Sequence, residues 1–451
     1  MAFVIEAVAH DHGWIPLTHE DIHDDGQNVF SLVVGQNATG KSRLLRKIVS
    51  HFIFDNQFSE RDRYLRQNPM APMSHYSHLS GNEELVVGRW SAPSPSKIIA
   101  VSTGRHDRFP TPNSKELIDP TGRYHYIAPS EKGNVSALTR SLIAITSGLE
   151  THPWKFMSLA SIFRYLGFEP ILDFKLSLDP ALRVQWTRDH AKAGGHTMLT
   201  LPGWEEAPKK YQYDKSLVDY HYQLLDHIYR QKHVSYEIDL GLSEPSRNYF
   251  SLENVADALR SGLIRVSDLT LNVRENHSRL KLSQASSGQQ CMLVMILGIA
   301  GSIEDNSLIC IDEPEISLHP KWQTDIISQL QYAFHGYRGC HFIIATHSPQ
   351  IVAGLTADKG FVLSLEDRQL YSSKDYSNRS ADYQLAQVFN APGVNNEYLI
   401  RITLMLLTKI SRREVLNRED WEQLEMLDQL KESLASNDPV RHLIDQVQML
   451  R

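Results

Sequence analysis

Mostly apolar runs, followed by apolar positions at helical spacing, occur in two separate parts of this chain. Residues Asn28–Val34 form one such run, and the apolar positions of Arg43–Phe52 recur at the spacing of a helix. Two further runs lie at Leu308–Ile311 and Phe342–Ala345, after an apolar stretch at Cys291–Ala300. Strands that are apolar at every position are typical of a parallel sheet covered on both faces. The pattern predicts an α/β core whose sheet is divided between two parts of the chain.

The intervening and final segments have helical patterns. Helical spacing occurs at Ser136–Leu149, Lys155–Leu166 and Lys215–Gln231, interrupted by strand-like pieces such as Ser235–Leu240. From Asn396 onward the sequence is rich in Leu, Glu, Gln and Arg at helical spacing. We expect four parts: the N-terminal half of an α/β lobe at 1–134, a mainly helical insertion lobe at 135–279, the C-terminal half of the α/β lobe at 280–395, and a helical assembly tail at 396–451.

Composition narrows the class of protein. Hydrophobic residues make up 41% of the 451 residues, which suits packed cores and excludes a disordered chain. The formal net charge is −7, so any contact with nucleic acid must be a local patch. The longest apolar run is about half the length that crosses a bilayer, and the N-terminus lacks the pattern of a signal peptide. With only three cysteines, we expect a cytoplasmic, reduced protein without a membrane partner.

A glycine-rich segment between the first apolar strand and its helix carries the clearest chemistry. It reads Gly35-Gln36-Asn37-Ala38-Thr39-Gly40-Lys41-Ser42, the pattern GxxxxGKS of the phosphate-binding loop. Its glycines let successive N–H groups point at a phosphate, at a helix N-terminus whose dipole favours anions. We expect these residues and Arg43 to bind ATP, with Lys41 on the β- and γ-phosphates and Ser42 on Mg²⁺.

Two carboxylates follow the apolar run at Leu308–Ile311. Asp312 and Glu313 emerge at the carboxyl end of this strand, where ligands bind in parallel sheets. Neighbouring strand residues point to opposite faces, so the two acids should have different roles. We expect Asp312 to hold Mg²⁺ through water and Glu313 to orient or deprotonate the attacking water. Without the phosphate-binding loop, the pair would equally well be an ordinary strand end.

Two further segments complete the candidate site. Ser286, Ser287, Gly288 and Gln289 precede an apolar helix and match the signature motif of ATP-binding-cassette ATPases, usually LSGGQ. A serine and a glycine at a helix N-terminus offer hydroxyl and N–H groups to a phosphate, although a plain serine N-cap gives the same pattern. His347 follows the strand Phe342–Ala345, where a neutral histidine can hydrogen-bond a γ-phosphate.

The order of these motifs carries a family resemblance. IDEPEISLHP followed by ATHSPQI resembles bacterial ATPases of the overcoming-lysogenization-defect-like and structural-maintenance-of-chromosomes-like type, over residues 25–55 and 280–355. KIIAVSTGRHDRFP at 97–110 and SADYQLAQVFNAPGVNNEYL at 380–399 look like the ATPase subunit of Septu-type anti-phage systems, including those attached to some retrons.

The resemblance implies an α/β P-loop NTPase of the ABC/SMC head type, with a split core sheet, a helical insertion lobe and a helical C-terminal tail. Two heads would sandwich ATP as a homodimer or higher oligomer, with the signature serine on the partner's γ-phosphate. A separate HNH nuclease subunit would be the effector. The chain departs from the family at two positions: no glutamine follows the expected strand Lys97–Val101, and His319 occupies the D-loop position usually held by aspartate.

Other kinds of site fit less well. No Asp-x-Asp of a Toprim nuclease follows His347, so nuclease activity is expected in a partner. Solvated residues explain two polar groups better than a metal site or a nucleic-acid surface does. The first group contains His10, Asp11, His12, His19, His23 and Asp24, and the second contains Arg61, Arg63, Arg66, Arg105 and Arg108.

Two functions of other classes remain as alternatives. The chain could be a stand-alone DNA repair clamp that binds DNA directly, which the net charge of −7 disfavours. It could also be the nucleotide-binding subunit of a transporter. The separation of Lys41 and Ser287 along the chain disfavours this alternative, because it is about twice what a compact transporter subunit requires by family comparison.

Overall fold

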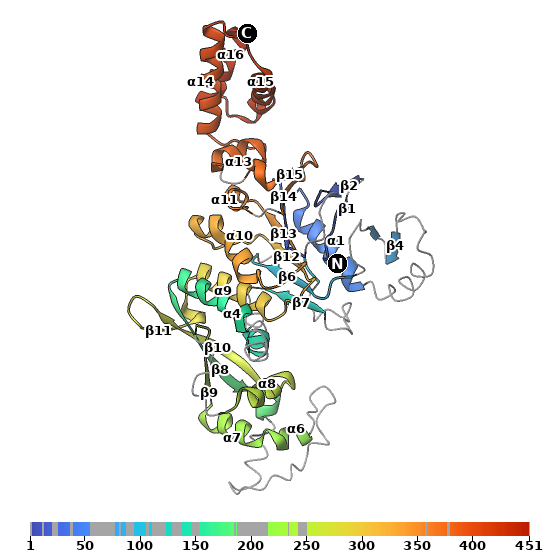
Figure 1. Cartoon of the computed structure of the whole chain (residues 1–451), viewed down its shortest axis with the longest axis vertical. Coiled ribbons are helices and arrows are strands. Elements are labelled where there is room, and N and C mark those ends of the chain that lie inside the picture. Colours follow the sequence, from blue (N-terminus) through green and yellow to red (C-terminus); the bar gives the residue numbers. More distant parts are fainter. Residues whose placement is uncertain are drawn as a thin grey trace. The chain divides into compact units, whose positions relative to one another are not determined.

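The computed structural model forms two compact units (Figure 1). The first unit contains residues 1–126, 305–331 and 338–451, and the second contains residues 127–304 and 332–337. The residues described are 2–10, 13–19, 26–36, 39–54, 77–80, 83–86, 94–104, 108–110, 123–128, 138–145, 153–184, 186, 215–232, 234–241, 250–356, 359–376 and 379–450. Within these units, the segment 280–304 groups with the insertion and the tail groups with the central part of the chain.

A seven-stranded sheet forms the centre of the first unit, in the order β15-β14-β3-β13-β12-β6-β7. Its inner strands β14, β3, β13, β12 and β6 are parallel, and β15 is antiparallel to β14. The strands are β3 (Val29–Val34), β6 (Ile98–Ser102), β7 (Tyr124–Ile127), β12 (Leu308–Asp312), β13 (His341–Thr346), β14 (Gly360–Ser364) and β15 (Leu370–Ser372). The strands contributed by the two distant parts of the chain are interleaved, which confirms the predicted split α/β core.

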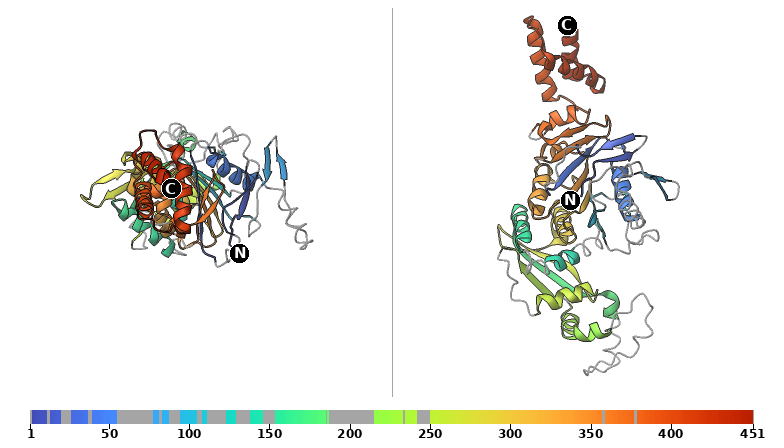
Figure 2. Two further views of the ribbon diagram at one scale, coloured as in Figure 1. Left: turned by 90° about the horizontal axis from the view of Figure 1, so that it is seen from above. Right: turned by 45° about the vertical axis from the view of Figure 1, so that its right-hand side comes forward.

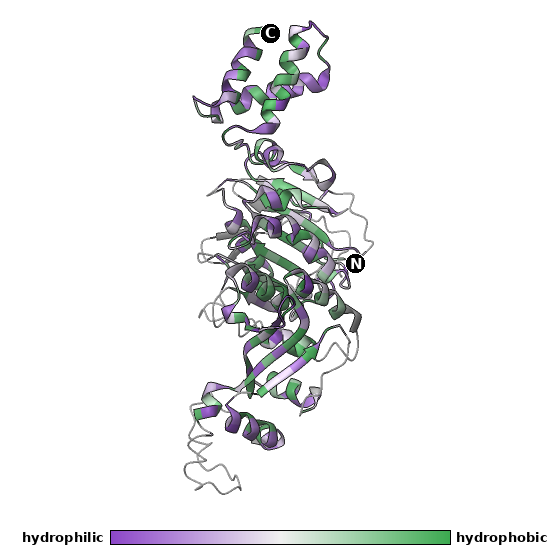
Figure 3. Ribbon diagram, turned by 90° about the vertical axis from the view of Figure 1, so that its left-hand side faces the viewer, coloured by the Kyte–Doolittle hydropathy of each residue, from purple (hydrophilic) through white to green (hydrophobic). Residues whose placement is uncertain are grey.

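Burial on both faces explains why these strands are mostly apolar in sequence. Every residue of β3, β6, β12, β13 and β14 is buried. On one face, Val33, Cys310 and Ile343 share a core with Leu44 and Ile48 of α1 (Lys41–Phe54). Figure 3 shows the hydrophobic character of these strands.

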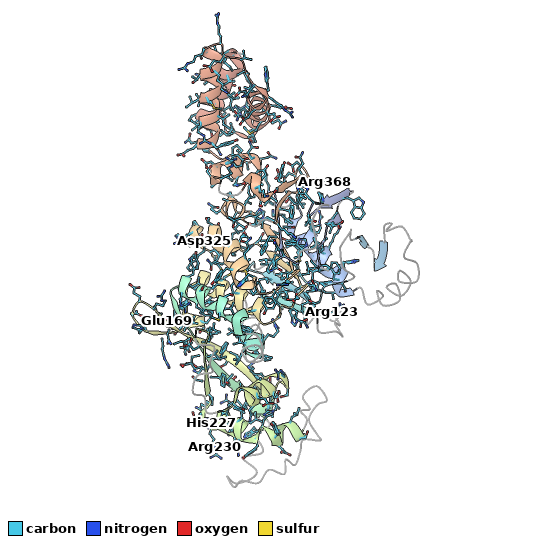
Figure 4. All side chains as sticks on the ribbon, in the orientation of Figure 1. Arg123, Glu169, His227, Arg230, Asp325 and Arg368 are labelled. Carbon is cyan, nitrogen blue, oxygen red and sulfur yellow. The ribbon has the colours of Figure 1, made fainter. Side chains whose placement is uncertain are left out.

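The first unit contains further strands and helices besides this sheet. The turn between β14 and β15 contains Arg368, which is labelled in Figure 4. The other strands are β1 (Ala7–His10), β2 (Gly13–Pro16), β4 (Ser77–Ser80) and β5 (Glu83–Val86). The other helices before the tail are α10 (Pro320–Phe334), α11 (Pro349–Ala353), α12 (Ser373–Tyr376) and α13 (Ala381–Gln387), of which α10 runs into the second unit.

A buried histidine joins the N-terminal segment to the central sheet. His341, the first residue of β13, is fully buried, and its Nδ1 accepts a hydrogen bond of 3.0 Å from the N–H of Ile5. Its Nε2 lies 2.9 Å from Ser31 Oγ, and that hydroxyl donates to the carbonyl oxygen of Leu17 at 2.7 Å. Nδ1 therefore lacks a proton and Nε2 carries it. Burial lowers the pKa of His341 to about 3, so the ring is neutral.

The second unit contains a four-stranded antiparallel sheet in the order β11-β10-β8-β9. These strands are β8 (Phe168–Leu178), β9 (Val234–Asp239), β10 (Ile264–Val273) and β11 (Arg279–Lys281). Its helices are α4 (Pro153–Tyr165), α6 (Lys215–Tyr220), α7 (Tyr222–Gln231), α8 (Leu252–Arg260), the short η3 (Leu282–Gln284) and α9 (Ser287–Ala300), and residues 138–145 are also helical. The insertion thus combines helices with a sheet.

The helix predicted over residues 215–231 is two helices in the structure. His221 separates α6 from α7 and has φ −91° and ψ 9°, which departs from helical geometry. Its ring Nδ1 lies 2.8 Å from Asn254 Oδ1, a partner distant in sequence. Such a contact is invisible to an analysis of spacing along the chain, because the pattern of apolar positions continues across the break.

The C-terminal tail is a small helical bundle with a core of its own. It contains α14 (Glu397–Ser411), α15 (Arg418–Leu430), the short η4 (Lys431–Ser433) and α16 (Pro439–Leu450), which lie side by side in both views of Figure 2. Leu399, Ile402, Leu424, Leu427 and Ile444 are among its buried core residues. The apolar stripes of the three helices therefore cover one another.

Two further expectations concern membrane-spanning helices and the cysteines. In the part of the chain that the structure describes, the helices are too short or too polar to cross a membrane. Cys291, Cys310 and Cys340 are all free thiols, and the last two are buried.

Candidate nucleotide-binding site

Three adjacent strands end at the same edge of the central sheet, and each is followed by a residue predicted for the site. The parallel register aligns the last residues of β3, β13 and β12 to within one position. Gly35, His347 and Glu313 are the next residues along the chain after these three strands. The carboxyl ends of parallel strands are where such sheets bind ligands. This edge is therefore the candidate site.

The phosphate-binding loop has a backbone that requires glycine. Gly35 has a φ of +154°, and a Cβ placed on it would lie 2.8 Å from Thr39 Oγ1, closer than real Cβ atoms come. Gly40 also has a positive φ, of 98°. Both positions therefore favour the one residue without a side chain. Asn37 and Ala38 of the predicted loop lie outside the described residues.

Lys41 is enclosed by its own loop. Its side chain is only 4% exposed, and its Nζ donates to the carbonyl oxygens of Gly35 at 2.7 Å and Gln36 at 2.9 Å. Burial lowers the pKa of Lys41 to about 8, against the opposite influence of the nearby carboxylates, chiefly Glu313. Phosphate oxygens are acceptors of the same kind as these carbonyls, so the ammonium group is suited to bind them.

Ser42 and Asp312 form a pair of oxygen ligands. The Ser42 hydroxyl donates to Asp312 Oδ1 at 3.1 Å, and Asp312 is 4% exposed. A hydroxyl and a carboxylate are the hard oxygen donors that Mg²⁺ prefers, and Mg²⁺ usually takes only one or two carboxylates together with substrate phosphates. The two residues therefore fit the predicted ion. Arg43 lies beside them on the exposed side of the first turn of α1.

Glu313 has an unusual backbone conformation. Its φ of 51° lies in the left-handed region, which costs a residue with a side chain about 1 kcal/mol or more. The N–H of Glu313 donates to Ala345 O at 2.9 Å, and its carbonyl oxygen accepts from the hydroxyl of Thr103. Its carboxylate lies above Gly104, where a Cβ would be 3.2 Å from Oε2. Neighbouring strands therefore hold this carboxylate in a strained position.

His347 lies between the loop lysine and the strand-end glutamate. Lys41 Nζ is 3.0 Å from His347 Nδ1, and His347 Nε2 is 3.5 Å from Glu313 Oε1. An ammonium group can only donate, so Nδ1 accepts and Nε2 carries the proton that faces Glu313. Burial, together with the charge of Lys41, lowers the pKa of His347. The structure thus brings Lys41, Ser42, Asp312, Glu313 and His347 together.

Two residues at this edge, Thr103 and Glu315, were not among the predicted site residues. Thr103 follows β6 and contacts the backbone of both strand-end acids, donating its N–H to Asp312 O at 3.3 Å. Glu315 accepts hydrogen bonds from the loop after β13, and burial raises its pKa. Two signals in the sequence could have found them. Thr103 is a polar residue that follows an apolar strand, and Glu315 is the last acid of the sequence Asp-Glu-Pro-Glu.

The predicted signature residues belong to the second unit. Ser286 is the N-cap of α9 and forms a capping box with Gln289, in which each side chain bonds the other's backbone N–H. Ser286 and Ser287 are exposed, whereas Gly288 is buried. The N-cap interpretation therefore holds, and the exposed helix N-terminus leaves the proposed phosphate contact sterically open.

Several other predicted residues are now placed. His319 of the expected D-loop position is exposed at the start of α10. His19, from the N-terminal polar group, packs edge-on against Phe361 with ring centroids 5.4 Å apart. In the described part of the chain, no group of three or more His, Cys, Asp or Glu residues could hold a metal ion. Asp11, His12, His23, Asp24, Arg61, Arg63, Arg66 and Arg105 lie outside the described residues, as does the side chain of His10.

Comparisons with known proteins point to one group of ATPases. The family described as "AAA domain, putative AbiEii toxin, Type IV TA system" matches residues 195–353. The retron Ec83 probable ATPase of Escherichia coli is 32% identical over 133 residues, 24% of this chain and 24% of that protein. The retron Vc95 probable ATPase of Vibrio cholerae is 26% identical over 116 residues, 23% and 22% of the two chains. The Septu protein PtuA of Bacillus mycoides is 29% identical over 103 residues, 21% and 14%.

The matched stretch therefore spans a quarter or less of each relative. Among solved structures, Stu0660 of Streptococcus thermophilus is 14% identical over the whole of both chains, with a TM-score of 0.35. The Smc head domain of Pyrococcus furiosus is 12% identical over 80% of this chain and 92% of that one, with a TM-score of 0.30. The sequence matches agree with the predicted resemblance: residues 195–353 match an AAA-domain model, and parts of the chain are similar in sequence to the probable ATPases of two retrons and to a Septu protein.

Proposed function

We propose that this chain is the ATP-binding and ATP-hydrolysing switch and scaffold subunit of a bacterial anti-phage defence complex in the cytoplasm. The observation that carries the proposal is the meeting of Lys41, Ser42, Asp312, Glu313 and His347 at one sheet edge. Two of the named relatives are probable ATPases of retrons and the third is a Septu protein, which supports the biological setting.

Each of these residues has a distinct role in the proposed reaction. Lys41 binds the β- and γ-phosphates, and Ser42 with Asp312 holds Mg²⁺, which supplies positive charge against the phosphate oxygens when bound. Glu313 orients the attacking water and accepts its proton. His347 donates its Nε2 proton toward the γ-phosphate oxygens. Its present contacts with Lys41 and Glu313 would be exchanged for that contact in the nucleotide complex.

Dimerisation would complete the site. The exposed Ser286 and Ser287 at the N-terminus of α9 would contact the γ-phosphate held by a second copy of the chain, as in the cassette family. ATP would then join two heads, and its hydrolysis would separate them. An HNH nuclease subunit would sense this change and cut nucleic acid. Nuclease activity is assigned to that partner and not to this chain.

The hydrolysis part of the proposal is tested with Glu313→Gln and Lys41→Ala. Glu313→Gln should still bind ATP and should hydrolyse it about 10²- to 10⁴-fold more slowly, because the amide cannot accept the proton. Lys41→Ala should abolish ATP binding, because the buried positive charge is lost. Isothermal titration and phosphate release measure both, and Glu253→Ala at an exposed position of α8 is the control.

Three outcomes would count against this assignment. They are wild-type turnover in Glu313→Gln, unchanged ATP affinity in Lys41→Ala, and salt-dependent DNA binding by the chain alone without an effect of ATP. The last result would favour the DNA repair clamp. The dimer is tested separately, because Glu313→Gln should accumulate as a larger species with ATP and Mg²⁺ in light scattering.

The tail at 396–451 is proposed to hold the complex together. Its inner apolar residues pack on one another, yet Leu404 and Trp421 remain 48% and 47% exposed. Removing 412–451 would uncover the α14 residues Leu399, Ile402 and Leu406, so point substitutions are the cleaner test.

Leu404→Glu and Trp421→Glu should lower the mass of the oligomer or release the partner while ATP binding is unchanged. The mass is measured on protein co-expressed with its genomic neighbours. Gln429→Glu, which adds the same charge at an exposed polar position of α15, is the control. If both apolar variants keep the wild-type mass and partner, the tail is only a structural element.

A further inference from the structure

Glu315 connects the loop after β12 to the loop after β13 through both oxygens of its carboxylate. Oε1 accepts the backbone N–H of His347 at 2.6 Å, and Oε2 accepts the hydroxyl of Thr346 at 2.9 Å. Two consecutive residues of one loop are therefore bound by one side chain of the other. Hydrogen bonds to a charged acceptor are stronger than those between neutral groups.

The residues around this contact hold the same loop from the other side. Thr346 is fully buried, and its Oγ1 accepts the N–H of Ser348 at 2.9 Å. The Ser348 hydroxyl in turn donates to Gln323 Oε1 of α10 at 2.7 Å. The backbone on each side of His347 is therefore fixed by side chains, which leaves the imidazole as the part that can respond to a ligand.

The held backbone determines where the imidazole lies. His347 Nδ1 is 3.0 Å from Lys41 Nζ, and His347 Nε2 is 3.5 Å from Glu313 Oε1. Glu315 itself has both oxygens engaged by the loop, so its chemistry is to hold the ring rather than to accept a proton from water. A small displacement of a positioned catalytic group is expensive, on the order of 100-fold in rate for about 1 Å.

We propose that Glu315 is a positioning residue that sets His347 between Lys41 and Glu313 and so serves the hydrolytic step rather than the binding of nucleotide. This inference rests on the proposed ATPase function and adds a residue to it. The role requires a side chain of the length of glutamate that ends in two polar atoms, one for Thr346 and one for the N–H of His347. A glutamine keeps the shape, because its oxygen can accept the His347 N–H while its amide donates to Thr346 Oγ1.

The test compares Glu315→Ala with Glu315→Gln in the full chain. Glu315→Ala should lower kcat on the order of 10- to 100-fold and leave the dissociation constant of ATP unchanged. Glu315→Gln should recover most of the lost kcat, because both polar atoms are restored without the charge. The control is again Glu253→Ala, which makes the same change at an exposed position of α8.

A double-mutant cycle with His347→Ala separates positioning from other roles. If Glu315 acts through His347, adding Glu315→Ala to His347→Ala should cause no further loss of kcat. Losses that multiply in the double variant would overturn the proposal, and so would a matching loss of ATP affinity in Glu315→Ala. A glutamine variant as slow as the alanine variant would overturn it too.

A measurement without ATP distinguishes failure of this inference from failure of the proposed function. Side-chain nitrogen resonances of histidine, with that of His347 assigned through His347→Ala, report the protonation and tautomer of its ring in the free protein. Glu315→Ala should shift this resonance, and Glu315→Gln should not. An unchanged resonance in Glu315→Ala overturns the positioning role, whether or not the wild-type protein hydrolyses ATP.

Discussion

β13 has a histidine at its first residue, His341, and another, His347, just past its last. The first is fully buried and closed into hydrogen bonds with Ile5 and Ser31. The second is 30% exposed and lies between Lys41 and Glu313. Both rings are neutral, because burial lowers the pKa of each.

The difference between them comes from the two ends of a parallel sheet. At the carboxyl end, the chain leaves three adjacent strands through loops that present polar groups to one space. At the amino end of β13, the N-terminal segment covers the strand, and Phe3 and Ile5 belong to the apolar core there. The same residue type therefore stabilises the fold at one end and is available for chemistry at the other.

The largest effect that separates the two ends is expected for His347→Ala. Its kcat for ATP should fall on the order of 100-fold, because a donor aimed at the developing charge is lost. Its free energy of unfolding should stay within about 0.5 kcal/mol of the wild-type value, since the ring is partly exposed. Steady-state kinetics and chemical denaturation measure the two quantities. If His347→Ala lost much stability but kept a normal kcat, the two ends of β13 would not differ in the way described.

His341→Ala should have the opposite profile. It leaves the Ile5 N–H and the Ser31 hydroxyl without their buried partner and opens a cavity, which should cost about 2–4 kcal/mol of unfolding free energy. The fraction that remains folded should bind ATP with wild-type affinity. Ser31→Ala, which removes only one end of the chain of hydrogen bonds, should cost less. If His341→Ala and Ser31→Ala lowered the free energy of unfolding equally, the ring of His341 would not be the main contributor to these hydrogen bonds.

The smallest effect is a pH dependence carried by His341. Its pKa is about 3 in the folded protein and about 6.5 in an unfolded chain. Below pH 6.5 the unfolded state binds a proton that the folded state does not, so stability falls as the pH falls. Between pH 7.5 and 5.5 the wild type should lose on the order of 1 kcal/mol more than His341→Ala does. A parallel pH dependence in both proteins would show that this ring does not titrate on unfolding.

Local signals were sufficient for the main parts of the site. The pattern Gly35 to Ser42 predicted a phosphate-binding loop between a strand and a helix, and the structure has β3 and α1 on either side. The apolar runs that end in Asp312 and before His347 are β12 and β13. The strands and the helix could be predicted because strands buried on both faces, and loops that need glycine, constrain residue types at adjacent positions in the sequence.

Contacts between distant segments could not be predicted in this way. Nothing in the local sequence indicates that Glu315 accepts hydrogen bonds from Thr346 and His347, or that Thr103 bonds to the carbonyl oxygen of Glu313. His347 was predicted for the site because it follows an apolar strand, but nothing in the local sequence indicates that His341 is fully buried against Ile5 and Ser31.

The sequence by itself determined the class of the fold, the phosphate-binding loop and the acids at the end of β12, because each depends on neighbours along the chain. Tertiary structure alone decided which strands lie side by side, and therefore that Gly35, His347 and Glu313 meet at one edge. It also decided that the tail helices cover one another. The physical reason is that an apolar stripe indicates only that one face of a helix or strand is buried. The element that covers this face depends on packing in three dimensions.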